Sequence, residues 1–207
     1  TTNITVTDQV TKAQADTNNG YTTGQVVLNN ASDTVANLAT IEALDDSEMK
    51  FADDSSITVT DQATKTQLDT INGYTTTAVS VATITGTLTE ITALHNDAGL
   101  DISGALINVT DAVSLSQANT LNGYTTGQVT LTSVSDTVSN ITAIDALTTS
   151  EVTMAAATVT VTDAATLANA NAINGFTTGQ VTLNSVSETV SNIGSIDGLT
   201  TSEVTMA

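Results

Sequence analysis

Short stretches of alternating apolar and polar residues recur along the chain. The first reads "ITVTD" at residues 4–8, and similar stretches end at Asp61, Asp111 and Asp163. Alternation with a period of two is typical of a strand that is buried on one face. We therefore expect the apolar members to point into the core; they are Ile4, Val6, Ile57, Val59, Ile107, Val109, Val159 and Val161.

A different spacing follows the strand stretches. In "SDTVSNITAIDAL", residues 135–147, the apolar positions Val138, Ile141, Ile144 and Leu147 lie three apart, and Val190, Ile193, Ile196 and Leu199 match them. In "AATLANANAINGF" the corresponding set is Leu167, Ala170 and Ile173. A recurrence of three predicts one face of a short helix, α or partly 3₁₀.

The strand and helix patterns repeat with a fixed period. "NGYTTGQV" at 19–26 returns as "NGYTTTAV", "NGYTTGQV" and "NGFTTGQV", and its first glycines are 53, 50 and 52 residues apart. Each period contains two strand-helix units of about 26 residues. We predict a single α/β solenoid over 1–207, with repeats at 1–53, 54–103, 104–155 and 156–207. Its eight right-handed coils would carry a parallel sheet on one side. The abundance of Thr and Val leaves an all-β solenoid as the alternative.

Recurring Asp and Gly residues mark the expected helix ends. Asp is a favourable N-cap, because its carboxylate accepts hydrogen bonds from the first free amides. Gly in the left-handed conformation commonly ends a helix, and we expect the aromatic residue after it to fold back on the last turn. The predicted N-caps are Asp8, Asp33, Asp61, Asp111, Asp136 and Asp163. The predicted C-terminal caps are Gly20, Gly73, Gly123 and Gly175, followed by Tyr21, Tyr74, Tyr124 and Phe176.

Composition and charge exclude several partners and sites. Aromatic residues make up 2% of the chain, so the core must consist of aliphatic layers. The absence of Cys excludes disulfides and thiolate zinc sites. Three basic residues against 22 acidic ones give a formal charge of −19, which disfavours nucleic acids and anionic lipid surfaces. No apolar run reaches the length of a membrane span, so membrane insertion is not expected.

Few residues suggest chemistry. His95 is the only histidine, and we interpret it as a solvated loop residue rather than as part of a catalytic group. We therefore do not expect an enzyme. Thr-x-Thr rows on the outer strand face resemble those of ice-binding proteins, but β-branched polar residues also suit any exposed strand face. An acidic cluster supplies weak candidate ligands for Ca²⁺, which binds six to eight oxygens; they are Asp45, Asp46, Glu48, Asp53 and Asp54.

The motif "VSDTVSNITAIDAL" and its variants "ASDTVANLATIEAL" and "VSETVSNIGSIDGL" carry a family resemblance. They resemble the Val-Ser-Asp-Thr-Ala-Ala-Asn-Ile repeats of very large acidic proteins secreted by bacteria, including marine cyanobacteria and alphaproteobacteria. Such proteins are often exported by type I systems and serve as adhesins or surface-layer components. Residues 84–106 depart from the pattern, because Gly86 replaces the acid and "HNDAGLDISGA" replaces the usual loop.

These observations predict a structural role at the bacterial cell surface. We expect an extracellular spacer, scaffold or self-assembling element, excised from a longer repetitive protein and without a cofactor other than possible Ca²⁺. Its partners would be further copies of itself, end to end or side by side, since exposed strand edges favour association. The alternative is a binding module that recognises glycans, a cell-surface protein or ice through the sheet face or the coil loops.

Overall fold

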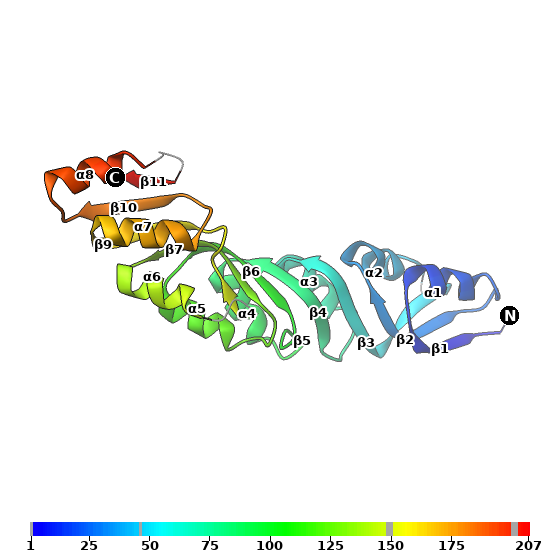
Figure 1. Ribbon diagram of the computed structural model, residues 1–207. Helices are drawn as coiled ribbons and strands as arrows, with labels where there is room; N and C mark the ends of the chain where they lie inside the picture. The colour runs from blue at the N-terminus through cyan, green and yellow to red at the C-terminus, as the bar shows by residue number, and fades with distance from the viewer. Residues whose placement is uncertain (1, 46, 148–150, 200–202) are drawn as a thin grey trace. The chain divides into compact units, whose positions relative to one another are not determined.

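The computed structural model describes residues 2–45, 47–147, 151–199 and 203–207. Strands and short helices alternate along them (Figure 1). The strands are β1 (Ile4–Val10), β2 (Val26–Asp33), β3 (Met49–Ala63), β4 (Val79–Gly86), β5 (Leu100–Asp101), β6 (Leu106–Val113), β7 (Val129–Asp136), β8 (Val152–Thr153), β9 (Thr158–Ala165), β10 (Val181–Val186) and β11 (Val204–Met206). The helices are α1 (Lys12–Asn19), α2 (Val35–Glu42), α3 (Lys65–Asn72), α4 (Leu88–His95), α5 (Leu115–Asn122), α6 (Val138–Asp145), α7 (Leu167–Phe176) and α8 (Val190–Asp197).

The chain divides into two compact units. The first comprises residues 1–85 and 90–105, and the second comprises residues 86–89 and 106–207. This division lies close to the predicted boundary between the second and third repeats at residues 103 and 104.

Both units contain parallel sheets built from β-α coils of about 26 residues. In the first unit β1, β2, β3 and β4 pair in sequence order, and β5 pairs with β4. In the second unit β6, β7, β9, β10 and β11 pair in order, and β8 pairs with β7. This arrangement confirms the predicted α/β solenoid, and the all-β alternative is wrong. Within each unit the helices follow one face of the sheet (Figure 1).

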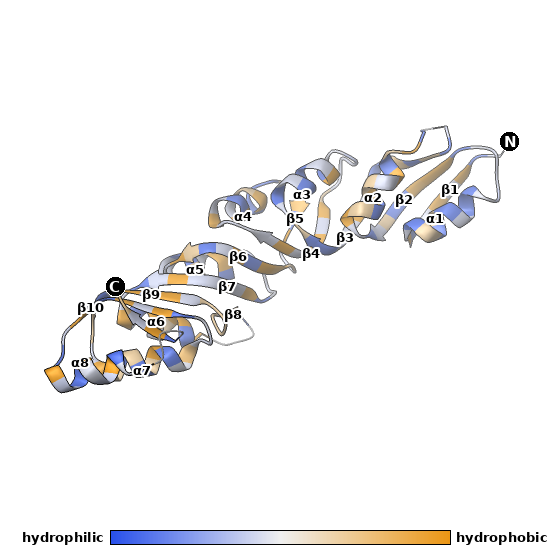
Figure 2. Ribbon diagram, turned by 90° about the horizontal axis from the view of Figure 1, so that it is seen from above, coloured by the Kyte–Doolittle hydropathy of each residue, from blue (hydrophilic) through white to orange (hydrophobic). Residues whose placement is uncertain are grey.

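The core consists of aliphatic residues from the strands and from the inner faces of the helices. Figure 2 shows the apolar residues gathered on the strands and in stripes on the helices. Most of the predicted inward positions are buried: Ile57, Val59, Ile107, Val109, Val159 and Val161 on the strands and Ile141, Ile144, Ala170, Ile173 and Ile196 on the helices. Others are only half-buried, namely Ile4, Val6, Val138, Leu147, Leu167 and Leu199. Each helix except α7 has only eight residues. Because isolated helices of this length are unstable in water, packing on neighbouring coils must maintain them.

Burial is incomplete on α8, the last helix among the described residues. Val190 and Ile193 of α8 are 88% and 38% exposed, whereas the equivalent Ile141 of α6 is fully buried. The three-residue pattern is the same in both helices. The difference arises because α7 packs against α6, and no helix follows α8 among the described residues.

The glycines end the helices differently from the prediction. Gly20, Gly73 and Gly123 are C-cap residues, but their φ angles of −65°, −71° and −72° are right-handed. No described glycine has a positive φ. The last turn instead tightens, and the amide of the following tyrosine bonds a carbonyl three residues back, as in Tyr74 N to Ile71 O at 2.9 Å. Gly175 lies inside α7, which ends at Phe176 and has Thr177 as its C-cap.

Two of the aromatic residues after these glycines lie in different surroundings. Tyr21 is 76% exposed. Tyr74 stacks on Phe51, a residue of β3, with 6.0 Å between ring centroids and a 10° angle between the ring planes. The ring of Tyr74 therefore packs against the strand of its own coil. Its position depends on which residue of that strand lies beside it.

Substitution of Gly175 and of Gly179 distinguishes a glycine required for its backbone conformation from a glycine required because no side chain fits. A Cβ at Gly175 meets nothing within 4 Å, so Gly175→Ala should stabilise α7 by about 0.5–1 kcal/mol. A Cβ at Gly179 would lie 2.2 Å from Ala157 O, so Gly179→Ala should destabilise by about 2 kcal/mol. Urea unfolding followed by circular dichroism measures both changes. A loss of stability for Gly175→Ala would contradict the right-handed helix end.

Candidate functional site

Threonine or serine caps the N-termini of seven helices. In each, the hydroxyl oxygen accepts a hydrogen bond from the backbone amide three residues later, which satisfies one of the free amides of the first turn. The caps are Thr11, Thr34, Thr64, Ser114, Thr137, Thr166 and Thr189. The prediction that the recurring Asp residues are the N-caps is therefore wrong for Asp8, Asp33, Asp61, Asp111, Asp136 and Asp163.

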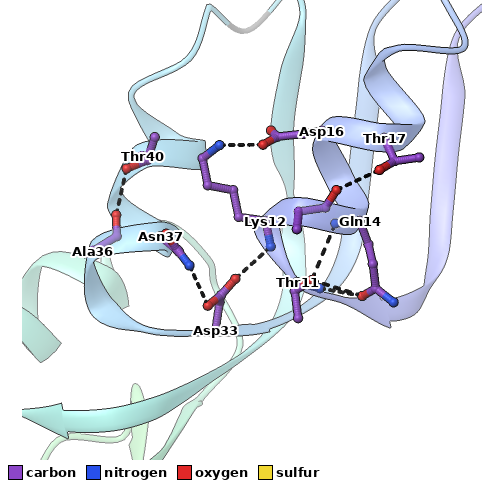
Figure 3. Close-up of polar contacts among 10 residues, drawn as sticks. Thr11, Lys12, Gln14, Asp16, Thr17, Asp33, Ala36, Asn37 and Thr40 are labelled. Carbon is purple, nitrogen blue, oxygen red and sulfur yellow. Dashed lines mark hydrogen bonds and ion pairs between the residues drawn. The ribbon is translucent and has the colours of Figure 1, made fainter.

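The acidic residues bond helix N-termini in a different way: each reaches the helix of the preceding coil. The carboxylate accepts a hydrogen bond from the amide of the first residue of that helix. Figure 3 shows the first example, in which Asp33 accepts from Lys12 N at 2.8 Å. The others are Asp61 with Val35 N and Asp111 with Leu88 N at 2.8 Å, Asp136 with Leu115 N at 2.9 Å, Asp163 with Val138 N at 2.8 Å, and Glu188 with Leu167 N at 3.1 Å. We call these six contacts the acidic links.

A β-bulge positions half of the acids. The register between neighbouring strands shifts at Thr60-Asp61, Thr110-Asp111 and Thr162-Asp163, where two residues face one residue of the next strand. A bulge re-aims the side chain that it carries. The recurring "TD" is thus the bulge dipeptide, and its Asp points along the sheet toward the preceding helix rather than capping its own.

The other three acids, Asp33, Asp136 and Glu188, directly precede a cap threonine and make additional bonds. Asp136 accepts from the amide of Thr137 at 2.8 Å and from the side chain of Asn140 at 2.9 Å, besides its link to Leu115 N. Asp33 and Glu188 have the corresponding bonds with Asn37 and Asn192. Each of these carboxylates therefore joins the N-termini of two successive helices.

The hydrogen bonds alter the acidity of these carboxyls. Burial by itself raises the pKa of Asp33, but hydrogen bonds from Asn37, Lys12 N and Thr34 N and the charge of Lys12 together lower it. Burial likewise opposes, without reversing, the lowering of the pKa of Asp136 by Leu115 N, Asn140 and Thr137 N. The bond from Asn192 is the main cause of the lowered pKa of Glu188. The bonded carboxylates are thus held in the charged form.

A second set of contacts joins successive loops through the "TTG" part of the repeated octapeptide. Thr177 donates its hydroxyl hydrogen to Ala157 O at 2.6 Å, and Thr178 donates both its amide hydrogen, at 2.8 Å, and its hydroxyl hydrogen, at 3.1 Å, to Ala155 O. Gly179 allows the backbone to approach Ala157 closely, since a side chain there would collide with it. Thr75 and Thr76 make corresponding bonds to Ser55 O and Asp53 O.

The acidic cluster considered for Ca²⁺ is not gathered into one site among its described members. Asp45 accepts from Ser47 N at 2.8 Å, and the bonds from Ser47 lower its pKa. Asp53 and Asp54 lie exposed within β3, Glu48 precedes that strand, and Asp46 lies outside the described residues. Over the described ranges there is no group of three or more His, Cys, Asp or Glu residues that could hold a metal ion.

His95 and the lysines occupy helix surfaces. His95 lies exposed in the last turn of α4, not in a loop. Lys12 and Lys65 form exposed ion pairs with Asp16 and Asp69 one helical turn away, at 2.6 Å in both cases. Exposed pairs of this kind contribute only about 0.3–0.5 kcal/mol each. Their role is therefore local to α1 and α3.

The comparisons with known proteins leave the family open. No protein-family model matches the chain, and neither curated proteins nor solved structures include a significant match. None of the helices in the described part of the chain has the length and apolar character needed to cross a membrane. The function must therefore be inferred from the contacts within the coils.

The capping residues were missed although their signal is present. "TKAQ", "TKTQ", "SLSQ" and "TLAN" each place a hydroxyl residue three positions before Gln or Asn. In α1, α3, α5 and α7 the structure shows the reciprocal bonds of a capping box at these residues. The recurring Asp residues were predicted as the N-caps instead, because they stand out more clearly in the repeated sequence.

The acidic links should make a measurable contribution to stability. Asp136→Ala removes three hydrogen bonds to one carboxylate, and we expect a loss of about 2 kcal/mol at neutral pH. Glu151→Ala, which removes an exposed carboxylate of the same unit, is the charge-matched control and should change stability by less than about 0.5 kcal/mol. Urea unfolding measures both. Equal effects would show that the links contribute nothing beyond charge.

The lowered pKa values of Asp33 and Asp136 predict a pH dependence of definite sign. A carboxyl whose pKa is lower in the folded state stabilises that state above its unfolded pKa. This contribution disappears as the pH falls through the folded pKa. The stability difference between the wild type and an Asp33→Ala/Asp136→Ala variant should therefore be complete at about pH 6 and decline below about pH 4. Urea midpoints across this range test it, and a constant difference would contradict it.

Proposed function

We propose that this chain is a structural repeat segment, a spacer or scaffold of a large extracellular protein on a bacterial surface. The observation that carries the proposal is the set of acidic links. Residue types that in other proteins bind ligands here join one coil to the next, at six places in two units. The six carboxylates of the acidic links thus serve to connect successive coils of the solenoid.

The loop contacts support the same role. The "TTG" hydroxyls bond backbone carbonyls of the loop 20–23 residues earlier. Both sets of contacts run from one coil to its neighbour, and the aliphatic core is continuous between them within each unit. A molecule of this kind lengthens by adding coils without changing its local structure, which is the requirement for a spacer.

The cell-surface location rests on the sequence resemblance and on charge. The "VSDTVSNI" motifs resemble repeats of secreted bacterial adhesins and surface-layer proteins, and the net charge of −19 suits a soluble extracellular segment. In the structure, Thr137 and Asn140 of this motif donate hydrogen bonds to the carboxylate of Asp136 at the start of α6. The residues that carry the resemblance are thus those that organise the coil.

Binding through the sheet surface is a second candidate, favoured by the outer rows of the second unit. Thr160, Thr182 and Thr205 stand side by side on β9, β10 and β11, and Asn108, Thr130 and Thr153 do so on β6, β7 and β8. Polar side chains, five with hydroxyl groups and one with the amide of Asn108, repeat in these rows at the strand spacing of about 4.8 Å, an arrangement suited to glycans or ice. Lys50 and Val27 interrupt the corresponding row in the first unit.

Deletion of one period tests the structural proposal. Removing residues 112–163 joins Asp111 to Ala164 in phase and should leave a cooperatively folded protein with an unchanged helical content per residue. The control deletion, residues 112–149, removes fewer residues but joins the coils out of phase, so it should lose much more stability. Circular dichroism and thermal unfolding compare the two. An unfolded in-phase variant would overturn the modular spacer.

A further inference from the structure

An inner helix, α3, lacks an acidic link although a further coil follows it. Its first residue is Lys65, and among the described residues no carboxylate accepts a hydrogen bond from the backbone amide of Lys65. The position that Asp33 and Asp136 hold in the equivalent coils is occupied by Gly86, the last residue of β4. Glycine has no side chain, so this coil supplies no acceptor to α3. The missing link is therefore a property of the sequence of this coil.

A second residue of the same motif is also changed. Three coils contain the pattern acid-Thr-x-x-Asn, in which the asparagine side chain donates a hydrogen bond to the acid. The pairs are Asp33 with Asn37, Asp136 with Asn140 and Glu188 with Asn192. The coil of α4 instead reads "GTLTE", with Gly86 for the acid and Glu90 for the asparagine. Both the acid and the donor that orients it are thus replaced in this coil.

The contacts within α3 match those of a linked helix. Thr64 and Gln67 form a capping box, and Lys65 pairs with Asp69 one turn away. The helix α1 has the same capping box and the same kind of ion pair, and in addition its first amide donates to Asp33. The difference between the two helix N-termini is therefore the acid from the following coil.

The C-terminal half of α3 is held more firmly than its first turn. Leu68 and Ile71 are buried in the core. The side chain of Asn72, the last residue of the helix, lies so close to the loop before β5 that a side chain on Gly99 would collide with it. These contacts act on the second half of the helix, so any local opening of α3 starts at its N-terminus.

Electrostatics acts in the same direction. A hydrogen bond to a charged acceptor stabilises more than one between neutral groups, and an acid interacts favourably with the positive N-terminus of a helix. In α1 the charge of Lys12 at the first helical position acts on Asp33 of the following coil. The equivalent Lys65 has no acid at residue 86 to act on. Local unfolding begins where the fewest contacts hold a segment, which among the inner helices is the start of α3.

We propose that the solenoid contains a built-in opening point, at which the first turn of α3 unfolds locally while the linked helices stay formed. Gly86 and Glu90 determine its position, because they remove the acid and its orienting asparagine from one coil. Each of the other described helices that is followed by a further helix has its acidic link. The use of the opening point rests on the proposed structural function: in a spacer under load, this coil is the part that yields first.

Amide hydrogen exchange compares α3 with the linked helix α5. In both helices the fourth amide donates to the carbonyl of the cap residue, from Leu68 to Thr64 at 3.0 Å and from Ala118 to Ser114 at 2.9 Å. Leu68 and Ala118 are both fully buried. We expect the protection factor of the Leu68 amide to be about tenfold lower than that of the Ala118 amide at neutral pH. Equal or greater protection of Leu68 would overturn the proposal.

Exchange of the two motif residues between coils tests the cause. Gly86→Asp/Glu90→Asn restores the pattern acid-Thr-x-x-Asn and should raise the protection of Leu68 about tenfold while leaving Ala118 unchanged. The reverse variant, Asp136→Gly/Asn140→Glu, removes the link of α5 and should lower the protection of Ala118 by a similar factor.

The control for the restoring variant is Gly86→Ala/Glu90→Asn, which changes the same two positions but adds no acid. It should alter the protection of Leu68 less than roughly twofold. An increase as large as that of Gly86→Asp/Glu90→Asn would show that the glycine backbone, and not the missing carboxylate, determines the opening, and would overturn the proposal.

The outcomes separate this inference from the structural function. If the restoring variant does not fold, the reverse variant decides, and an unchanged protection of Ala118 in it means that the opening point is wrong. The deletion of residues 112–163 leaves α3, Gly86 and Glu90 in place, so its folding tests the modular coil independently. A folded deletion with equal protection of Leu68 and Ala118 in the full chain refutes the opening point alone. An unfolded deletion with the expected exchange refutes the spacer and leaves the local opening of α3.

Discussion

The first amides of every short helix need hydrogen-bond acceptors, and this requirement organises the molecule. An eight-residue helix leaves half of its backbone amides without a partner inside the helix. Here the cap hydroxyl supplies one acceptor from the same coil, and a carboxylate from the following coil supplies another. For six of the described helices an acceptor therefore comes from the following coil, and their local secondary structure depends on stacking.

The strand geometry follows from the same need. A regular strand would direct the Asp side chain toward one face of its own sheet, but the bulge at "TD" redirects it toward the neighbouring helix. In the alternate coils no bulge is required, because Asp33 and Asp136 directly precede the cap residue. Two local solutions thus place a carboxylate at equivalent positions, which explains why the acid recurs while its spacing from the cap differs.

Sequence reasoning succeeded where periodicity decides the outcome and failed where a partner lies in another coil. The buried faces of β6 and α6 follow directly from spacings of two and three residues, as Ile107 and Ile141 show. The acids were recognised but given the wrong helix, because capping rules consider only residues adjacent in sequence. The prediction of left-handed glycines was wrong for a related reason: a tightened last turn satisfies the same carbonyls as a left-handed residue. Exposure of Val190 depends on what lies beyond α8, which no local pattern contains.

The direction of the acidic links has a consequence for the order in which the chain matures. Because six of the described helices receive an acid from the coil that follows, a chain that emerges from its N-terminus has, at each of these helices, an unfinished helix at its growing end. The previous coil becomes complete only when the next strand has formed. Each of these coils is therefore completed only after the following coil has emerged. The edge of the newest strand is the surface that the next segment of the same polypeptide reaches first.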